Sequence, residues 1–405
     1  MYHSNMNQES NFKNLCNLTT SLLGLRKGSL SAKSRKQELQ IARSVASVVG
    51  RMVEDIHQTV IAKEIKRDRS LIYHYEKKHE SNYATFPKYR DIFNIVYNAY
   101  TKIEDAKLTF IDLFAGIGGF HIALKSIGME SVLTCEIDKH ARETYLRNFK
   151  DPYLKNKNLF PEDIWDIDFK KIPDFDILCA GFPCQPFSQV GQKKGFKDNK
   201  SGNLFFAIEE ILKIKKPTAF ILENVRFLKN HDNGKTFKTI YTKLQKLNYT
   251  FDAQILKASD YGLPTHRPRI FMVGFYKPKI KSAFKELPFT FPNKINLKKT
   301  ISDVMGGFCS TDFTGKKERK IGFTMRVGGG RSGVLDRRNW DSYIVNKKEV
   351  RISPQQGLEL MGFPKSFKFP VSNSQALKQL GNSVATNVIK AVAKEMQRYI
   401  KNYTS

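Results

Sequence analysis

The sequence predicts an α/β fold in which helices cover both faces of a mostly parallel β-sheet. Two observations support this prediction. Between residues 106 and 277, short apolar runs alternate with amphipathic stretches of helical period, the pattern of strand–helix–strand units. The first apolar run also leads directly into glycines and then a helical stretch. In such sheets ligands bind at the carboxyl ends of the strands, and we expect every chemical motif of this chain to lie at such an end.

The expected elements follow one another in order. Each strand is an apolar run of strand length, and each helix is a longer amphipathic stretch between two runs. The predicted strands are residues 108–114, 132–136, 175–182, 219–223, 251–257 and 269–275, and the predicted helices are residues 119–127, 139–148, 204–214 and 236–247.

A chain of 405 residues is long enough for two or three domains. We expect a polar, helical extension over residues 1–105, the α/β domain over 106–277, and an irregular region rich in Gly and Lys over 278–345. Helical spacing resumes over 346–405, which we expect to return to the α/β domain.

Charge and hydropathy narrow the class of protein. No apolar run is long enough to span a bilayer, and the first residues lack a secretion signal, so we expect a soluble, cytoplasmic protein. The 68 Lys and Arg against 39 Asp and Glu give a net charge of +29, which attracts polyanions. Nucleic acid is the expected partner; a charge that serves solubility, or an acidic protein partner, is the alternative.

The five cysteines are Cys16, Cys135, Cys179, Cys184 and Cys309, and no two of them form a CxxC pair. Their small, odd number and scattered positions argue against a disulfide scaffold and against a zinc site. We therefore expect no metal, and any cysteine chemistry would fall to a single thiol.

The turn after the first predicted strand is suited to a nucleoside. Gly116, Gly118 and Gly119 let the backbone turn sharply and let a ligand approach closely. Glu136 ends the next strand, where a carboxylate can accept hydrogen bonds from ribose hydroxyls. The spacing G-x-G-G favours S-adenosylmethionine over a dinucleotide or a triphosphate; a purely structural turn is the alternative.

Cys184 lies in the run Gly-Phe-Pro-Cys-Gln-Pro-Phe-Ser (181–188), directly after a predicted buried strand. The prolines on either side stiffen the turn and can hold the sulfur outward, as a nucleophile requires. A buried, inert thiol is the alternative, and it is the interpretation that we apply to the other four cysteines.

Five segments together resemble, in order and spacing, the motif series of the C5-cytosine DNA methyltransferases. The resemblance covers residues 107–400 and implies a Rossmann-like, S-adenosylmethionine-dependent methyltransferase sheet with a small target-recognition domain. The segments are Asp-Leu-Phe-Ala-Gly-Ile-Gly-Gly (112–119), Gly-Phe-Pro-Cys-Gln-Pro-Phe-Ser (181–188), Glu-Asn-Val (223–225), Arg-Pro-Arg (267–269) and Gly-Asn-Ser-Val (381–384).

The resemblance implies four catalytic residues. Cys184 would add to carbon 6 of cytosine and thereby make carbon 5 nucleophilic. Glu223 would hold or protonate the ring nitrogen N3. Arg269 would reach the cytosine carbonyl and Arg267 would brace the site, while Thr265 stands where the family commonly has Gln.

The resemblance also implies the cofactor, S-adenosylmethionine, and the residues that hold it. They would form the glycine-rich wall, the ribose contact, the adenine contacts and the remainder of the pocket. In chain order they are Phe114, Gly116, Gly118, Glu136, Asp163, Ile164, Pro183, Leu204, Asn382 and Ser383.

Double-stranded DNA is the implied substrate, with the target nucleotide swung out of the helix. Residues 188–202, with Ser188, Lys193 and Lys194, resemble the family's mobile loop; an ordinary surface loop is the alternative. The region 278–345 occupies the place of target recognition. Its arginines could contact guanine edges or, more commonly, phosphates, and they are Arg326, Arg331, Arg337 and Arg338.

In the N-terminal extension, residues 37–53 predict one helix, and residues 59–79 resemble a helix-turn-helix with its turn at 67–70. Arg69, Ser70, Tyr73 and His74 would then face a DNA groove, and the domain would also bind its own promoter. The alternative is a helical extension that packs on the catalytic domain or pairs subunits.

The expected function is methylation of carbon 5 of cytosine in a specific duplex sequence, by a monomer or weak dimer that protects DNA from a partner restriction endonuclease. A tRNA cytosine methyltransferase is the alternative among enzymes. A DNA-binding regulator on an inactive methyltransferase scaffold is the alternative outside them.

Overall fold

The computed structural model describes residues 2–105, 107–183, 204–281, 288–327 and 332–404. They form two compact units, Met1–Lys107 and Leu108–Ser405. Cys184, Ser188, Lys193, Lys194 and Arg331 lie outside the described residues. In the described part of the chain, no helix combines the length and apolar character that crossing a bilayer requires.

The first unit is helical and has its own core, built around Phe12, Leu15, Val45, Ile61 and Phe93. Its second helix matches the predicted one, and the predicted helix-turn-helix segment does form two helices. The turn lies slightly earlier than expected because Asp68 caps the next helix through the Ser70 amide. The helices are α1 (Tyr2–Leu22), α2 (Gln37–Glu54), α3 (Gln58–Ile65), α4 (Arg69–Thr85) and α5 (Pro87–Asp105).

The second unit contains the predicted α/β sheet, with strand order β2-β1-β3-β4-β6-β5. The pairs β1–β2, β1–β3 and β3–β4 are parallel, whereas β6 runs antiparallel to both of its neighbours. All six predicted strands are present. They are β1 (Thr109–Leu113), β2 (Glu130–Cys135), β3 (Ile177–Gly181), β4 (Ala219–Val225), β5 (Asp252–Lys257) and β6 (Pro268–Phe275).

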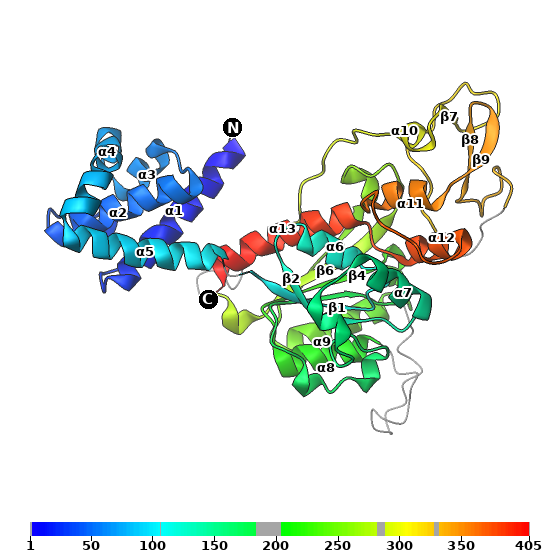
Figure 1. Cartoon of the computed structure of the whole chain (residues 1–405), viewed down its shortest axis with the longest axis horizontal. Coiled ribbons are helices and arrows are strands. Elements are labelled where there is room, and N and C mark those ends of the chain that lie inside the picture. The colour runs from blue at the N-terminus through cyan, green and yellow to red at the C-terminus, as the bar shows by residue number, and fades with distance from the viewer. Residues whose placement is uncertain (1, 106, 184–203, 282–287, 328–331, 405) are drawn as a thin grey trace. The chain divides into compact units, whose positions relative to one another are not determined.

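Helices cover both faces of this sheet, which confirms the predicted fold class (Figure 1). On one face, α6 (Gly119–Lys125) and the C-terminal α13 (Thr386–Tyr403) pack on the sheet through residues such as Phe120 and Val388. On the other face lie α8 (Phe205–Lys215) and α9 (Lys235–Lys246), which contribute Ile208 and Ile240. The helix α7 (Lys139–Asn148) follows β2.

The direction of β6 corrects one expectation. Arg267 and Arg269 lie at the amino end of a strand, not at a carboxyl end as predicted. Because β6 is antiparallel to β4, its amino end meets the carboxyl end of β4, and Arg269 pairs in register with Val225. The motif therefore still lies on the expected edge of the sheet.

The region expected to be irregular contains short regular elements. A small antiparallel sheet has the order β7-β8-β9, and its hairpin turns at Asn346 and Lys347, which both have positive φ. The elements are α10 (Ile301–Met305), β7 (Cys309–Ser310), β8 (Ser342–Val345) and β9 (Lys348–Arg351), followed by α11 (Pro354–Met361) and α12 (Asn373–Asn382).

Candidate active site

A cavity of about 420 Å³ opens at the sheet edge where β1 to β4 end and β6 begins. Most of the predicted site residues line it, although they come from five strand ends, from the short turn at 163–164, from the residue before α8 and from α12. The predicted residues that line the cavity are Phe114, Gly116, Glu136, Asp163, Ile164, Pro183, Leu204, Glu223, Arg267, Arg269 and Asn382.

The glycine-rich turn is held in a conformation that few residues tolerate. Phe114, Gly116 and Gly118 have φ values of 58°, 56° and 87°. A side chain at Gly118 would also collide with Phe149, whose ring would lie 2.3 Å from an added Cβ. Gly116 has open space at that position, so a ligand can approach its backbone. Gly118 therefore serves the shape of the turn, whereas Gly116 borders the cavity.

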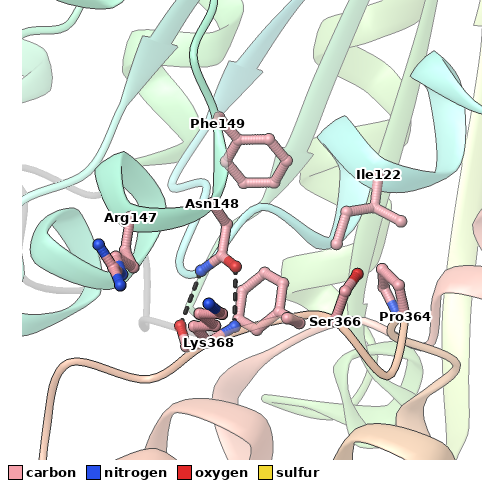
Figure 2. Close-up of a pocket in the computed structure, with 8 residues that line it drawn as sticks. Ile122, Arg147, Asn148, Phe149, Pro364, Ser366 and Lys368 are labelled. Carbon is pink, nitrogen blue, oxygen red and sulfur yellow. Dashed lines mark hydrogen bonds between the residues drawn. The ribbon is translucent and has the colours of Figure 1, made fainter.

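A second cavity, of about 360 Å³, lies between α6, the end of α7 and the loop after α11 (Figure 2). The Asn148 side chain joins two of these elements, because it donates to the Lys368 carbonyl and accepts from the Lys368 amide, both at 2.8 Å. Phe149 lines this second cavity and also meets Gly118. Phe149 thus connects the second cavity with the glycine turn, and none of the predicted site residues lines this cavity.

Glu136 is nearly buried and already bound by backbone amides. Its two carboxylate oxygens accept from the Gly116 amide at 2.6 Å and from the Asp138 amide at 2.8 Å. Burial raises the pKa of Glu136, and these two amides oppose that rise. The carboxylate therefore connects the end of β2 to the glycine turn, next to the cavity that both line.

Ile164 is buried, and Asp163 caps the short helical turn that follows it. One Asp163 oxygen accepts from the Trp165 amide at 3.0 Å. The capping places both residues on the cavity wall next to Glu162. Ser383 lies outside the lining but close to the turn, since a Cβ on Gly119 would meet its hydroxyl at 3.0 Å.

Helix α12 supplies lining residues that sequence reasoning missed. Gln375, Lys378 and Gln379 precede the predicted residue Asn382 at the spacing of one helix face, and all four line the cavity. Gln379 is 5% exposed; its Oε1 accepts from Thr144 Oγ1 at 3.0 Å, while its Nε2 has no hydrogen-bond partner among the described residues. The helical spacing before Asn382 was the signal that could have identified this face.

Glu223 and Arg269 form an ion pair inside the cavity. Arg269 Nε lies 3.0 Å from Glu223 Oε1, and both side chains are largely buried. Burial raises the pKa of Glu223 in spite of the two nearby arginines, Arg269 and Arg267, which lower it. The Asn224 amide group also donates to the Phe182 carbonyl at 2.8 Å, which holds the end of β4 against the start of the Cys184 segment.

Arg267 is buried and bound to three backbone carbonyls. It donates to Met325 at 3.2 Å, to Gly381 at 3.1 Å and also to Ser383. Burial, together with the positive charge of Arg269, lowers the pKa of Arg267 to about 9. Arg267 therefore joins the start of β6 to residue 325 and to the end of α12.

The segment before β6 pairs directly with residues 322–325. Thr265 Oγ1 donates to the Phe323 carbonyl at 2.7 Å, and the His266 amide donates to the Gly322 carbonyl at 2.8 Å. Gly381 lies so close to Arg326 that an added Cβ would be 2.7 Å from the Arg326 carbonyl oxygen. The region predicted to recognise the target is thus in contact with α12.

The four described cysteines, Cys16, Cys135, Cys179 and Cys309, are all buried. Burial raises the pKa of each, which keeps the thiols protonated. The role predicted for Cys184 concerns a residue outside the described part of the chain, but its neighbour Pro183 lines the cavity.

The described arginines of the predicted recognition region differ in their contacts. Arg326 and Arg337 are exposed, whereas Arg338 pairs with Asp336 at 2.8 Å. In the first unit, Arg69, Ser70, Tyr73 and His74 are exposed along the start of α4. Their exposure leaves these side chains accessible to DNA.

Comparison with known proteins gives one consistent result. The family model for C-5 cytosine-specific DNA methylase matches residues 108–347 and 316–398, so its matches begin where the second unit begins. The type II methyltransferase M1.ScrFI of Lactococcus lactis subsp. cremoris is 40% identical over 318 residues, which is 72% of this chain and 79% of that protein.

A second relative, the type II methyltransferase M.HhaI of Haemophilus parahaemolyticus, is 37% identical over 331 residues, covering 72% of this chain and 96% of that protein. The solved structure of Spodoptera frugiperda DNMT2 shares the fold, with a TM-score of 0.54 and 20% identity over 72% of this chain and all of that one. The chain therefore belongs to the C-5 cytosine-specific DNA methylases, enzymes that transfer the methyl group of S-adenosylmethionine to carbon 5 of cytosine in DNA.

Proposed function

We propose that the cavity at the sheet edge is the active site, and that this DNA (cytosine-5-)-methyltransferase acts within one double-stranded sequence through a covalent adduct of Cys184. The observation that carries the assignment is the buried pair of Glu223 and Arg269, which shares one cavity with the glycine turn. Glu223 can give a proton and Arg269 carries a fixed positive charge. Both thus lie beside a site suited to a nucleoside.

The residues of the cavity fit S-adenosylmethionine. Gly116 leaves open space for a close approach, and Glu136 lies at the end of β2, where ribose hydroxyls can donate to it. The unpartnered Nε2 of Gln379 needs an acceptor that the described residues do not supply. Phe114, Asp163, Ile164, Pro183, Leu204, Asn382 and Ser383 would complete the site. The bound cofactor supplies an electrophilic methyl group.

In this proposal the residues of the chain make the cytosine nucleophilic. The Cys184 thiolate adds to carbon 6, and the electron pair that moves from the ring double bond makes carbon 5 reactive. Glu223 gives a proton to N3, so that negative charge does not build up on the ring. Arg269 holds the cytosine carbonyl and Arg267 keeps the strand end in place. After transfer, a general base takes the proton from carbon 5, the double bond re-forms and the thiolate leaves, while N3 returns its proton to Glu223.

The contacts with DNA are part of the same proposal. The target nucleotide leaves the duplex because carbon 5 cannot be reached inside it. Ser188, Lys193 and Lys194 would belong to the segment that closes over the flipped base. Arg326, Arg331, Arg337 and Arg338 would contact phosphates and guanine edges of the recognition sequence.

The two relatives are named type II methyltransferases, which favours a restriction-modification role. We infer that the enzyme protects DNA from a partner endonuclease, in the cytoplasm and at the nucleoid of a prokaryotic cell, as a monomer or weak dimer. The helix pair α3–α4, with Arg69, Ser70, Tyr73 and His74 exposed, would bind duplex DNA, including the chain's own promoter.

Single-turnover transfer of labelled methyl to duplex DNA and to tRNA tests the proposal. Transfer to DNA alone is expected, and Cys184→Ala should abolish it while leaving the affinity for S-adenosylhomocysteine unchanged. Transfer to tRNA alone, or an active Cys184→Ala variant, would contradict the proposal. Methylation-sensitive sequencing of DNA from expressing cells would then identify the target sequence.

A further inference from the structure

The linker between α1 and α2, residues 23–36, is strongly basic. It contains Arg26, Lys27, Lys33, Arg35 and Lys36 and no acidic residue. All five side chains are exposed, and none of them forms an ion pair with a described acidic residue. A surface on which positive charges outnumber carboxylates favours a polyanionic partner.

A buried arginine donates hydrogen bonds to the backbone of this linker. Arg43, on α2, is 2% exposed and donates to the carbonyls of Leu30 at 2.7 Å, Ala32 at 2.7 Å and Ser34 at 2.9 Å. Leu30 is itself buried and anchors the linker in the core of the first unit. The basic side chains therefore extend from a fixed backbone.

The linker also contacts the turn between α3 and α4. Arg67, in that turn, donates to the Ala32 carbonyl. Lys66 and Arg69 are exposed on either side of Arg67, and they extend the basic surface to the start of α4. Two acidic groups lie near this surface: Asp68 caps α4 through Ser70, and Glu38 lies 3.6 Å from Lys88.

The positive charges of Arg43 and Arg67 lie close enough to repel each other. The pKa of Arg43 is lowered first by burial and then by the nearby charge of Arg67. Neither arginine forms an ion pair with a described carboxylate. An anion bound along the linker would relieve this repulsion, and a chain of phosphates would do so for several side chains at once.

We propose that the linker 23–36 is a phosphate-binding edge of the first unit, and that it holds the backbone of duplex DNA beside the groove that α4 enters. This rests on the proposed DNA binding by α4. The charge is spread over several exposed side chains, as backbone contact requires, whereas Tyr73 and His74 on α4 can reach base edges. The linker would add affinity without adding sequence preference.

The test measures binding of the full chain to duplexes of unrelated sequence as a function of salt. The variant Lys33→Ala/Lys36→Ala should bind every duplex less tightly, by about the same factor for each. The slope of log affinity against log salt should become shallower by roughly two. The matched control, Lys13→Ala/Lys246→Ala, removes two exposed lysines on α1 and α9 and should leave that slope nearly unchanged. Both variants should keep wild-type melting temperatures and single-turnover methylation.

A third variant, Arg69→Ala/Tyr73→Ala, separates this proposal from the one on which it rests. If the α4 variant weakens binding and the linker variant does not change the slope, the linker proposal is wrong while DNA binding by α4 stands. If neither variant changes binding, DNA binding by the first unit fails as a whole. An equal change of slope in the linker variant and the control would also contradict the proposal, because the effect would then follow net charge alone.

Discussion

Glu223 carries the clearest chemical expectation for a single residue. Burial raises its pKa, so more of the enzyme holds the proton that N3 must receive. Glu223 is fully protonated at pH values below the ordinary pKa of a carboxyl group, and it loses its proton as the pH rises through the raised pKa. We therefore expect kcat/KM to fall on the alkaline side with the pKa of Glu223, and Glu223→Gln to lower kcat/KM by roughly 10²- to 10⁴-fold.

The measurement is a pH profile of kcat/KM for the wild-type enzyme and for Glu223→Gln. In the variant, the alkaline fall that belongs to Glu223 should be absent, and the affinity for S-adenosylhomocysteine should be unchanged. A variant that loses cofactor affinity instead would show that Glu223 acts in binding.

Gln379 offers a second test at a single residue. Its Oε1 is held by Thr144, and its Nε2 lacks a described partner in a cavity that fits the cofactor. In Gln379→Glu, an oxygen can still accept from Thr144, but the amide donor is gone. We expect calorimetry to show S-adenosylhomocysteine binding roughly tenfold weaker or worse, because a lost hydrogen bond in a buried site costs about 1–3 kcal/mol.

The control for this test is Gln375→Glu, which places the same charge on the same face of α12, at a less buried position. Equal losses in the two variants would mean that added negative charge, and not the Gln379 donor, weakens binding.

At the scale of one element, the glycine turn after β1 and the turn between α6 and β2 provide a matched pair of substitutions. Gly118 and Gly128 have φ values of 87° and 86°, but only Gly118 has neighbours where a Cβ would lie. Gly128→Ala should cost about 1–2 kcal/mol of unfolding free energy for the left-handed backbone alone. Gly118→Ala should cost about 1–3 kcal/mol more, because Phe149 must move.

Chemical denaturation gives these free energies, and calorimetry with S-adenosylhomocysteine gives the effect on the site. We expect only Gly118→Ala to weaken cofactor binding. If the two variants lose equal stability and both bind the cofactor normally, the contact with Phe149 has no structural importance.

The elements that depend on local sequence patterns could be predicted, and those that depend on contacts between distant segments could not. The six strands and the glycine turn depend on local patterns of apolar residues and glycines, so the sequence was enough to place them. The hairpin of β8 and β9 was missed because its turn uses Asn346 and Lys347, without the glycine that usually marks such a turn. The antiparallel direction of β6 was also missed, because strand direction depends on contacts between distant segments.

The candidate site shows the same division. Glu136, Glu223 and Asn382 were identified from motifs, whereas the three carbonyls that hold Arg267 lie 58 to 116 residues away along the chain. No local pattern reports such contacts. Gln379 is an intermediate case. Its helical spacing before Asn382 can be read from the sequence, whereas the lack of a described partner for its Nε2 cannot.

For the whole molecule, the division into two compact units predicts how the chain responds to truncation. The sheet, the cavity and α13 all lie within Leu108–Ser405, and Met1–Lys107 has a separate core. A chain of residues 108–405 should therefore fold, bind S-adenosylhomocysteine with wild-type affinity and methylate a duplex that contains the target. Circular dichroism, calorimetry and single-turnover assays check these three outcomes, and a folded fragment without cofactor affinity would refute the prediction.

The contact between Gly381 and Arg326 limits how this enzyme could be given a new sequence specificity. An exchange of the recognition region with that of a relative would seem to require only a cut in an exposed loop. Residues 322–326, however, bind Thr265, Arg267 and the end of α12. A chimera should thus keep residues 322–326 of this enzyme and take the relative's sequence only beyond them. Otherwise the exchange that changes the recognised DNA sequence will also disable the cofactor site.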